Sequence, residues 1–170
     1  MSATRFTLPS MPRRTALIVA VPEAEQAVGA YRLAHDWSAG VGVPAHLTVL
    51  FPFVPPEAVD EAAIGSVVAQ VPAFAFALTA VERFADGTVW LRPDPSAPFT
   101  ALTRAVWERW PEHPPYEGAH DEVIPHLTVS EEPIDVAIDL PIQARATHVT
   151  LIEEDEGGRW HERARFPLGG

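Results

Sequence analysis

Hydrophobic and polar positions alternate in short blocks along the chain, and these blocks predict brief strands separated by a few helices. The block at 15–21 is apolar and β-branched almost throughout, which is typical of a buried strand. Elsewhere apolar residues recur every three or four positions, as at Ile64, Val67 and Val71, which indicates one buried helix face. The patterns predict strands at 15–21, 46–53, 74–84, 88–93 and 126–129, helices at 22–34, 56–71 and 98–110, and a closing β-hairpin over 146–166.

The strand that begins at His46 carries polar side chains on one of its faces. Successive strand residues point to opposite faces, so His46 and Thr48 share one face. Leu47 and Val49 share the other face and provide its apolar backing. The sequence therefore predicts an imidazole and a hydroxyl side by side on a strand that is anchored in the core.

The same tetrapeptide, His-Leu-Thr-Val, recurs 80 positions later and places His126 and Thr128 on one strand face. A proline shortly precedes each copy, and each half of the chain has the order helix, motif strand, connection and hairpin. We therefore predict an α+β fold that is bilobal. Two pseudo-symmetric antiparallel β-sheets would flank a central cleft, with helices on the outer faces and both motifs inside the cleft.

Length and composition fit a single domain. The chain has 170 residues, is 47% hydrophobic and has a mean hydropathy of +0.03, which is enough apolar material for a sizeable core. We predict that residues 1–14 form a flexible leader and that residues 15–170 form a single bilobal domain. The apolar run at 15–21 is too short for a signal peptide or a membrane span. We expect a cytoplasmic monomer that does not associate with membranes.

Charge and cysteine content narrow the chemistry. A net charge of −11 repels polyphosphate backbones and argues against bulk nucleic-acid binding, although a pocket with a few local donors can still hold a small phosphate ligand. The chain has no cysteine, which removes disulfides, thiolate metal sites and cysteine nucleophiles.

The two motifs suit one class of reaction. Cleavage of a cyclic phosphodiester needs a base that deprotonates the attacking water and an acid that protonates the departing oxygen. Histidine has an ordinary pKa of about 6.5, so one imidazole can be neutral while its partner is protonated near neutral pH. Threonine hydroxyls can donate to the non-bridging phosphate oxygens, and the chemistry requires no metal.

Two His-x-Thr motifs at this separation, behind the opening strand TALIVAV and ahead of the closing GGRWHERARF, closely resemble the two-histidine (2H) phosphoesterase superfamily. The resemblance is to its 2′-5′ RNA ligase-like and cyclic phosphodiesterase branch. It implies that His46 and His126 are catalytic and that Thr48 and Thr128 bind the substrate. It also implies an enzyme without metal or cofactor that hydrolyses 2′,3′-cyclic phosphates or 2′-5′ phosphodiester bonds, or catalyses the reverse ligation.

The substrate within this class stays open at the level of sequence. Glu131 and Glu132 follow the second motif and, with the acidic total charge, favour a small nucleotide or a short RNA end over long RNA. A non-catalytic nucleotide- or phosphate-binding module with the same fold is the alternative. Which histidine is the base and which the acid is also open.

A third triplet, His148-Val149-Thr150, occurs in the last long strand. The family has no counterpart for it, and we expect His148 to be structural. Four further residues with base- or phosphate-binding chemistry are expected to be ordinary surface or packing residues: Tyr116, Arg159, Trp160 and Arg163.

Overall fold

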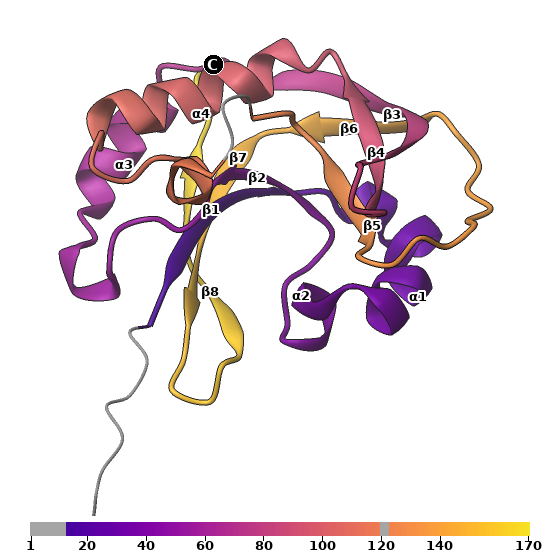
Figure 1. Ribbon diagram of the computed structural model, residues 1–170. Coiled ribbons are helices and arrows are strands. Elements are labelled where there is room, and N and C mark those ends of the chain that lie inside the picture. Colours follow the sequence, from indigo (N-terminus) through magenta and orange to yellow (C-terminus); the bar gives the residue numbers. More distant parts are fainter. Residues whose placement is uncertain (1–12, 120–122) are drawn as a thin grey trace, which may run out of the picture.

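The computed structural model describes residues 13–119 and 123–170, and its strands form one curled, antiparallel sheet (Figure 1). The strands are β1 (Thr15–Ala20), β2 (His46–Leu50), β3 (Phe74–Arg83), β4 (Val89–Asp94), β5 (Leu127–Ser130), β6 (Ile142–Ala146), β7 (His148–Glu154) and β8 (Trp160–Pro167). The helices are α1 (Glu25–His35), α2 (Trp37–Gly40), α3 (Glu61–Val68) and α4 (Ala97–Arg109), with short 3₁₀ turns η1 (Pro22–Ala24), η2 (Pro56–Ala58) and η3 (Pro115–Gly118).

The α+β class and the antiparallel pairing are confirmed, but the two predicted sheets are joined into one. The strand order is β6-β3-β4-β5-β2-β1-β7-β8. The junction lies between β5 and β2, where Leu47 and Leu127 are register partners. Because both leucines are buried, this pairing continues the core across the junction.

The two halves of the sheet are not the two halves of the chain. One half, β2-β1-β7-β8, combines residues 15–50 with residues 148–167, and the other, β6-β3-β4-β5, consists of residues 74–146. The hairpin β3–β4 pairs with β5, and the final hairpin returns to β1. The sequence-based assignment of each hairpin to the preceding motif is therefore wrong, because antiparallel neighbours need not be neighbours in sequence.

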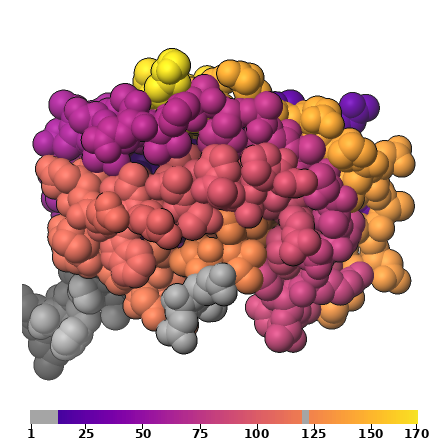
Figure 2. All heavy atoms as spheres, turned by 90° about the horizontal axis from the view of Figure 1, so that it is seen from above, coloured from indigo at the N-terminus to yellow at the C-terminus, as the bar shows by residue number. Residues whose placement is uncertain are grey.

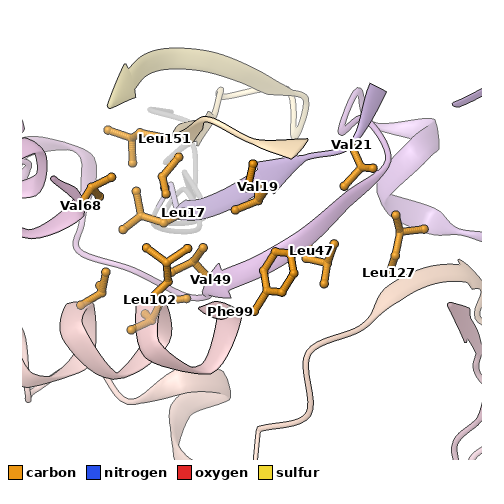
Figure 3. Packing of buried hydrophobic residues seen from close by; sticks show 14 of the residues in the cluster. Leu17, Val19, Val21, Leu47, Val49, Val68, Phe99, Leu102, Leu127 and Leu151 are labelled. Atoms are coloured by element: carbon orange, nitrogen blue, oxygen red, sulfur yellow. The ribbon is translucent and has the colours of Figure 1, made fainter. Parts of the chain in front are cut away.

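Helices α3 and α4 pack against each other and against the sheet, α4 on β2 and α3 on β8. Figure 2 shows the atoms of α3 and α4 side by side across the top of the molecule. In Figure 3, Phe99 and Leu102 of α4 point toward Leu47 and Val49 of β2, as the apolar backing of the motif predicts. The polar side of each motif strand faces away from this core.

The predicted helix at 56–71 is shorter than its apolar pattern. The turn η2 ends at Ala58, Val59 is extended, and α3 begins only after Asp60, whose side chain accepts a hydrogen bond from the Ala63 backbone. An aspartate that caps a helix in this way sets its first residue, which the apolar spacing alone does not reveal.

Most of the predicted leader, residues 1–12, lies outside the described residues. Its last two residues lie beside β7, where Arg13 is 3.9 Å from Glu153 and Arg14 is 2.7 Å from Glu154. No helix in the described ranges is long and apolar enough to cross a membrane.

Candidate active site

Both His-x-Thr motifs meet at the junction of the two sheet halves. His46 is the first residue of β2, and His126 immediately precedes β5. The antiparallel register at Leu47 and Leu127 brings the polar faces of the two strands together. A cavity of about 620 Å³ opens there, and it is lined by all four predicted residues: His46, Thr48, His126 and Thr128.

The two histidines are held in the same way. Nδ1 of His46 lies 2.7 Å from the Pro44 carbonyl oxygen, and Nδ1 of His126 lies 2.7 Å from the Ile124 carbonyl oxygen. A carbonyl can only accept, so in each ring Nδ1 carries the proton and donates it. In this tautomer Nε2 is the basic nitrogen of the neutral ring. Both imidazoles are thereby prepared for proton transfer at the same atom.

The environment of His46 favours its neutral form. Burial lowers the pKa of His46 from 6.5 to about 4, because the charged ring loses water. The Pro44 carbonyl acts in the opposite direction, while the Arg32 charge lowers the pKa further. The His46 ring is therefore neutral at pH 7 and able to accept a proton.

Aromatic residues of the β3–β4 hairpin pack around His126. The Phe84 ring meets the imidazole edge-on at 5.1 Å, and the Trp90 ring does so at 6.1 Å. Phe84 and Trp90 stack on each other at 4.7 Å. These contacts hold the His126 ring in place. They depend on the pairing of β4 with β5, which the sequence pattern does not reveal.

A buried ion pair supports the wall beside His46. Arg32 donates from Nε to an Asp36 carboxylate oxygen at 3.0 Å, and both side chains are at least 95% buried. The same guanidinium donates to the Val43 carbonyl and to the Ser38 hydroxyl. Asp36 and Ser38 line the cavity. The pair thus links the end of α1 to the segment that supplies the Pro44 acceptor. The sequence did not reveal this pair, because Arg32 lies on the predicted helix at 22–34 whereas Asp36 follows the end of that helix.

Tyr116, for which the sequence predicts an ordinary surface or packing role, lies at the wall of this cavity. It lines the cavity and shares a hydrogen bond with Thr48. Burial raises the pKa of its phenol, so the hydroxyl stays protonated. Its backbone has φ 53° and that of Glu117 has φ 57°, both in the left-handed region that non-glycine residues rarely adopt. The Tyr116 N–H donates to the Phe51 carbonyl at 2.7 Å, which fastens this turn to the end of β2.

The remaining candidates lie away from this cavity. Arg159 donates to the Gly40 carbonyl and Arg163 to the Pro56 carbonyl. Trp160 is buried in a small apolar cluster, where its ring meets Phe51 edge-on at 6.0 Å. His148 lines a different cavity and lies 3.0 Å from the Thr147 hydroxyl. None of these four lines the cavity that holds the paired motifs.

The acidic residues after the second motif are engaged by the end of α1. Glu131 accepts a hydrogen bond from the Trp37 backbone at 2.7 Å and lines the cavity, and Glu132 pairs with His35 at 2.9 Å. They contribute negative charge at one side of the site. Among the described residues, no cluster of three or more His, Cys, Asp or Glu side chains could hold a metal ion.

Comparison with known proteins concerns the sequence family and the fold. The family model described as the 2′-5′ RNA ligase superfamily matches residues 20–158. No curated protein matches the sequence. Among solved structures, Escherichia coli LigT complexed with 3′-AMP superposes with a TM-score of 0.66 at 20% identity, over 94% of this chain and 100% of that one. The protein TT0787 of Thermus thermophilus gives 0.64 at 19% identity, over 92% and 98%.

Proposed function

Because the chain belongs to the 2′-5′ RNA ligase superfamily, we propose that it is a metal-independent phosphoesterase that opens 2′,3′-cyclic phosphates or cleaves 2′-5′ phosphodiester bonds. His46 and His126 act as its acid–base pair. The competing proposal is a non-catalytic nucleotide-binding module with the same fold. The observation that carries the proposal is the matched pair of imidazoles, each donating from Nδ1 to a backbone carbonyl at the wall of one cavity.

The lowered pKa of His46 favours one division of roles within the pair. His46 is neutral at pH 7 and accepts a proton from the attacking water through Nε2. The water oxygen then bonds to phosphorus as the bond to one ribose oxygen breaks. His126, in its protonated form, supplies the proton to that departing oxygen. The product is a phosphomonoester beside a free ribose hydroxyl, and a proton returns from His46 to His126 through solvent before the next turnover.

The hydroxyl groups position the phosphate between the histidines. Thr48 and Thr128 lie two residues after their histidines on the same strand faces, where each can donate to a non-bridging oxygen. Tyr116, through its hydrogen bond with Thr48, fixes the orientation of one of these donors. Donors fixed before the substrate arrives stabilise the charge that develops in the transition state.

The structural relatives support a nucleotide as the ligand. Escherichia coli LigT has been crystallised with 3′-AMP, NADP+, ATP and phosphate. The cavity of about 620 Å³ is of the size that binds small molecules. The reverse ligation uses the same two proton transfers in the opposite order. A cytoplasmic location and a monomeric state stay predictions.

The test is steady-state turnover of nucleoside 2′,3′-cyclic phosphates and of a 2′-5′-linked dinucleotide, with EDTA in the assay. We expect release of a nucleoside monophosphate by the wild-type protein, and no release when His46 and His126 are both replaced by alanine. Absence of turnover on every substrate, together with measurable nucleotide binding, would favour the binding module.

A further inference from the structure

A second cavity adjoins the catalytic one. It has a volume of about 780 Å³ and shares Thr48, Val123 and Ile124 with the catalytic cavity as lining residues. An occupant held at Thr48 can therefore extend from one cavity into the other. The second cavity runs along α4 and β4, and we call it the α4 groove. In Figure 2 the orange segment that leads into β5 is visible between the atoms of α4 and those of the β3–β4 hairpin.

One polar stripe of α4 lines this groove. Its residues recur at helical spacing, whereas Leu102 and Val106 face the core, and the buried Phe99 lines the groove beside the stripe. Thr103 donates to the Val49 carbonyl at 2.7 Å, which fastens the stripe to β2 one residue beyond Thr48. The stripe consists of Ser96, the residue that precedes the helix, and of Thr100, Thr103, Arg104 and Trp107.

The groove carries cationic and aromatic chemistry that the catalytic step does not use. Within the described part of the chain, no carboxylate lies within ion-pair distance of Arg104, and this side chain is exposed. Arg92 faces it from β4 and is 3.6 Å from Glu82. Trp107 is 43% exposed, which is unusual for so large an apolar ring on a helix that is otherwise anchored in the core.

Guanidinium groups and an exposed indole together match a nucleotide. Arginine binds phosphate oxygens in a planar, bidentate manner, and an indole face stacks on any base. The net charge of −11 does not argue against a nucleotide in this groove, because charge acts locally. Among the described residues that line the groove, Glu108 is the only acidic one, and two are arginines. Among the described lining residues, guanidinium groups thus outnumber carboxylates.

We propose that the α4 groove binds a second nucleotide unit of the substrate, with its phosphate at Arg104 and Arg92 and its base on Trp107. This inference rests on the proposed function and names the substrate class. The preferred substrate is a short RNA end of at least two nucleotides, whose reacting phosphate lies between His46 and His126. A mononucleoside cyclic phosphate fills the catalytic cavity alone.

The experiment compares two substrates that share the reacting group. One is a nucleoside 2′,3′-cyclic phosphate, and the other is a dinucleotide that ends in the same cyclic phosphate. We expect kcat/KM for the dinucleotide to be roughly tenfold higher or more, since one base stack or one guanidinium–phosphate contact accounts for a factor of that order. Added salt should lower the preference, because part of it is electrostatic.

Substitutions test whether the preference for the dinucleotide arises in the α4 groove. Arg104→Ala and Trp107→Ala should each remove most of the dinucleotide advantage and leave turnover of the mononucleoside substrate unchanged. Arg145→Ala is the matched control, because it removes the same charge from β6, away from both cavities. We expect this variant to keep the full preference.

The outcomes separate the two proposals. Equal kcat/KM for both substrates, or a preference that survives Arg104→Ala and Trp107→Ala, would overturn the α4 groove while leaving the phosphoesterase intact. If neither substrate is turned over, the proposed function fails. The affinities for a nucleoside 3′-phosphate and a dinucleotide 3′-phosphate then still test whether the α4 groove binds a second nucleotide. Tighter binding of the dinucleotide that is lost in Arg104→Ala supports the groove, and equal binding refutes it.

Discussion

Leu47 of β2 and Leu127 of β5 are register partners at the junction between the two halves of the sheet. Each leucine directly follows a motif histidine, so the pairing in the core fixes where His46 and His126 lie on the opposite face. The position of the acid–base pair therefore depends on a strand pairing, whereas the orientation of each ring depends on a carbonyl two residues earlier.

His46→Ala and His126→Ala should each lower kcat by a factor of about 10² to 10⁴, because each removes a positioned proton-transfer group. His148→Ala is the matched control: it alters the third His-x-Thr triplet, which lines a different cavity. Steady-state kinetics on a 2′,3′-cyclic nucleotide measures all three. A loss of activity in folded His148→Ala as large as in the other two would show that the motifs are wrongly assigned.

The acid limb of the kcat/KM profile should lie near pH 4 and not near 6.5. Burial lowers the pKa of His46 to about 4, so the base stays neutral as the pH falls from 7 to 5. Initial rates at low substrate concentration across this range provide the measurement. An acid limb at the ordinary histidine value would argue against His46 as the buried base.

The same lowered pKa predicts how stability changes with pH. Between about pH 6.5 and 4 the unfolded state binds a proton at His46 that the folded state does not. His46 therefore has no such effect above pH 6.5, and the folded state loses stability as the pH falls from 6.5 toward 4. Urea unfolding at pH 7 and pH 5 should show a smaller loss of stability in His46→Ala than in the wild type. An equal loss in both proteins would contradict this.

Tyr116→Phe should reduce kcat/KM by roughly two- to tenfold, the effect of losing one hydrogen bond that orients Thr48. Tyr31→Phe is the control, because the Tyr31 hydroxyl accepts a hydrogen bond from the Ala137 backbone and takes no part in the cavity. The control should keep full activity. Equal losses of activity in the two variants would mean that the loss in Tyr116→Phe does not come from the missing hydrogen bond with Thr48.

Asp36→Ala should lower the free energy of unfolding by about 3–5 kcal/mol, because it leaves the buried Arg32 charge without its partner. Asp135→Ala removes one member of an exposed pair with Arg83, and its cost should be far smaller, because water screens the pair. Urea denaturation of both variants tests the contrast. A cost below about 1 kcal/mol for Asp36→Ala would show that the pair contributes little.

The sequence was sufficient for those parts of the site that depend on local periodicity. Alternation along one strand placed His46 and Thr48 opposite Leu47 and Val49, and the structure confirms the apolar backing. Repetition of the motif was enough to predict that both pairs face one cavity. The first relation involves neighbours in sequence, whose geometry follows from the two-residue strand period, whereas the second rests on the repeat itself.

Features that depend on distant partners could not be predicted in the same way. Tyr116 reaches the site because a turn with two positive φ values is fastened to Phe51, and neither contact has a sequence signal. Phe84 and Trp90 pack on His126 only because the β3–β4 hairpin joins the half that contains β5. The two positive-φ residues of this turn, Tyr116 and Glu117, are neither glycine nor asparagine, so the sequence does not reveal the turn.

The exchange of strands between the two halves also affects the order in which the chain can fold. The half that holds His46 needs β7 and β8, which lie about a hundred residues later in the chain. During synthesis, β1 and β2 are therefore made long before their sheet can be completed, while β3 to β6 follow one another and are available together. Completion of the His46 half must therefore await residues 148–167, which are made after both motif strands.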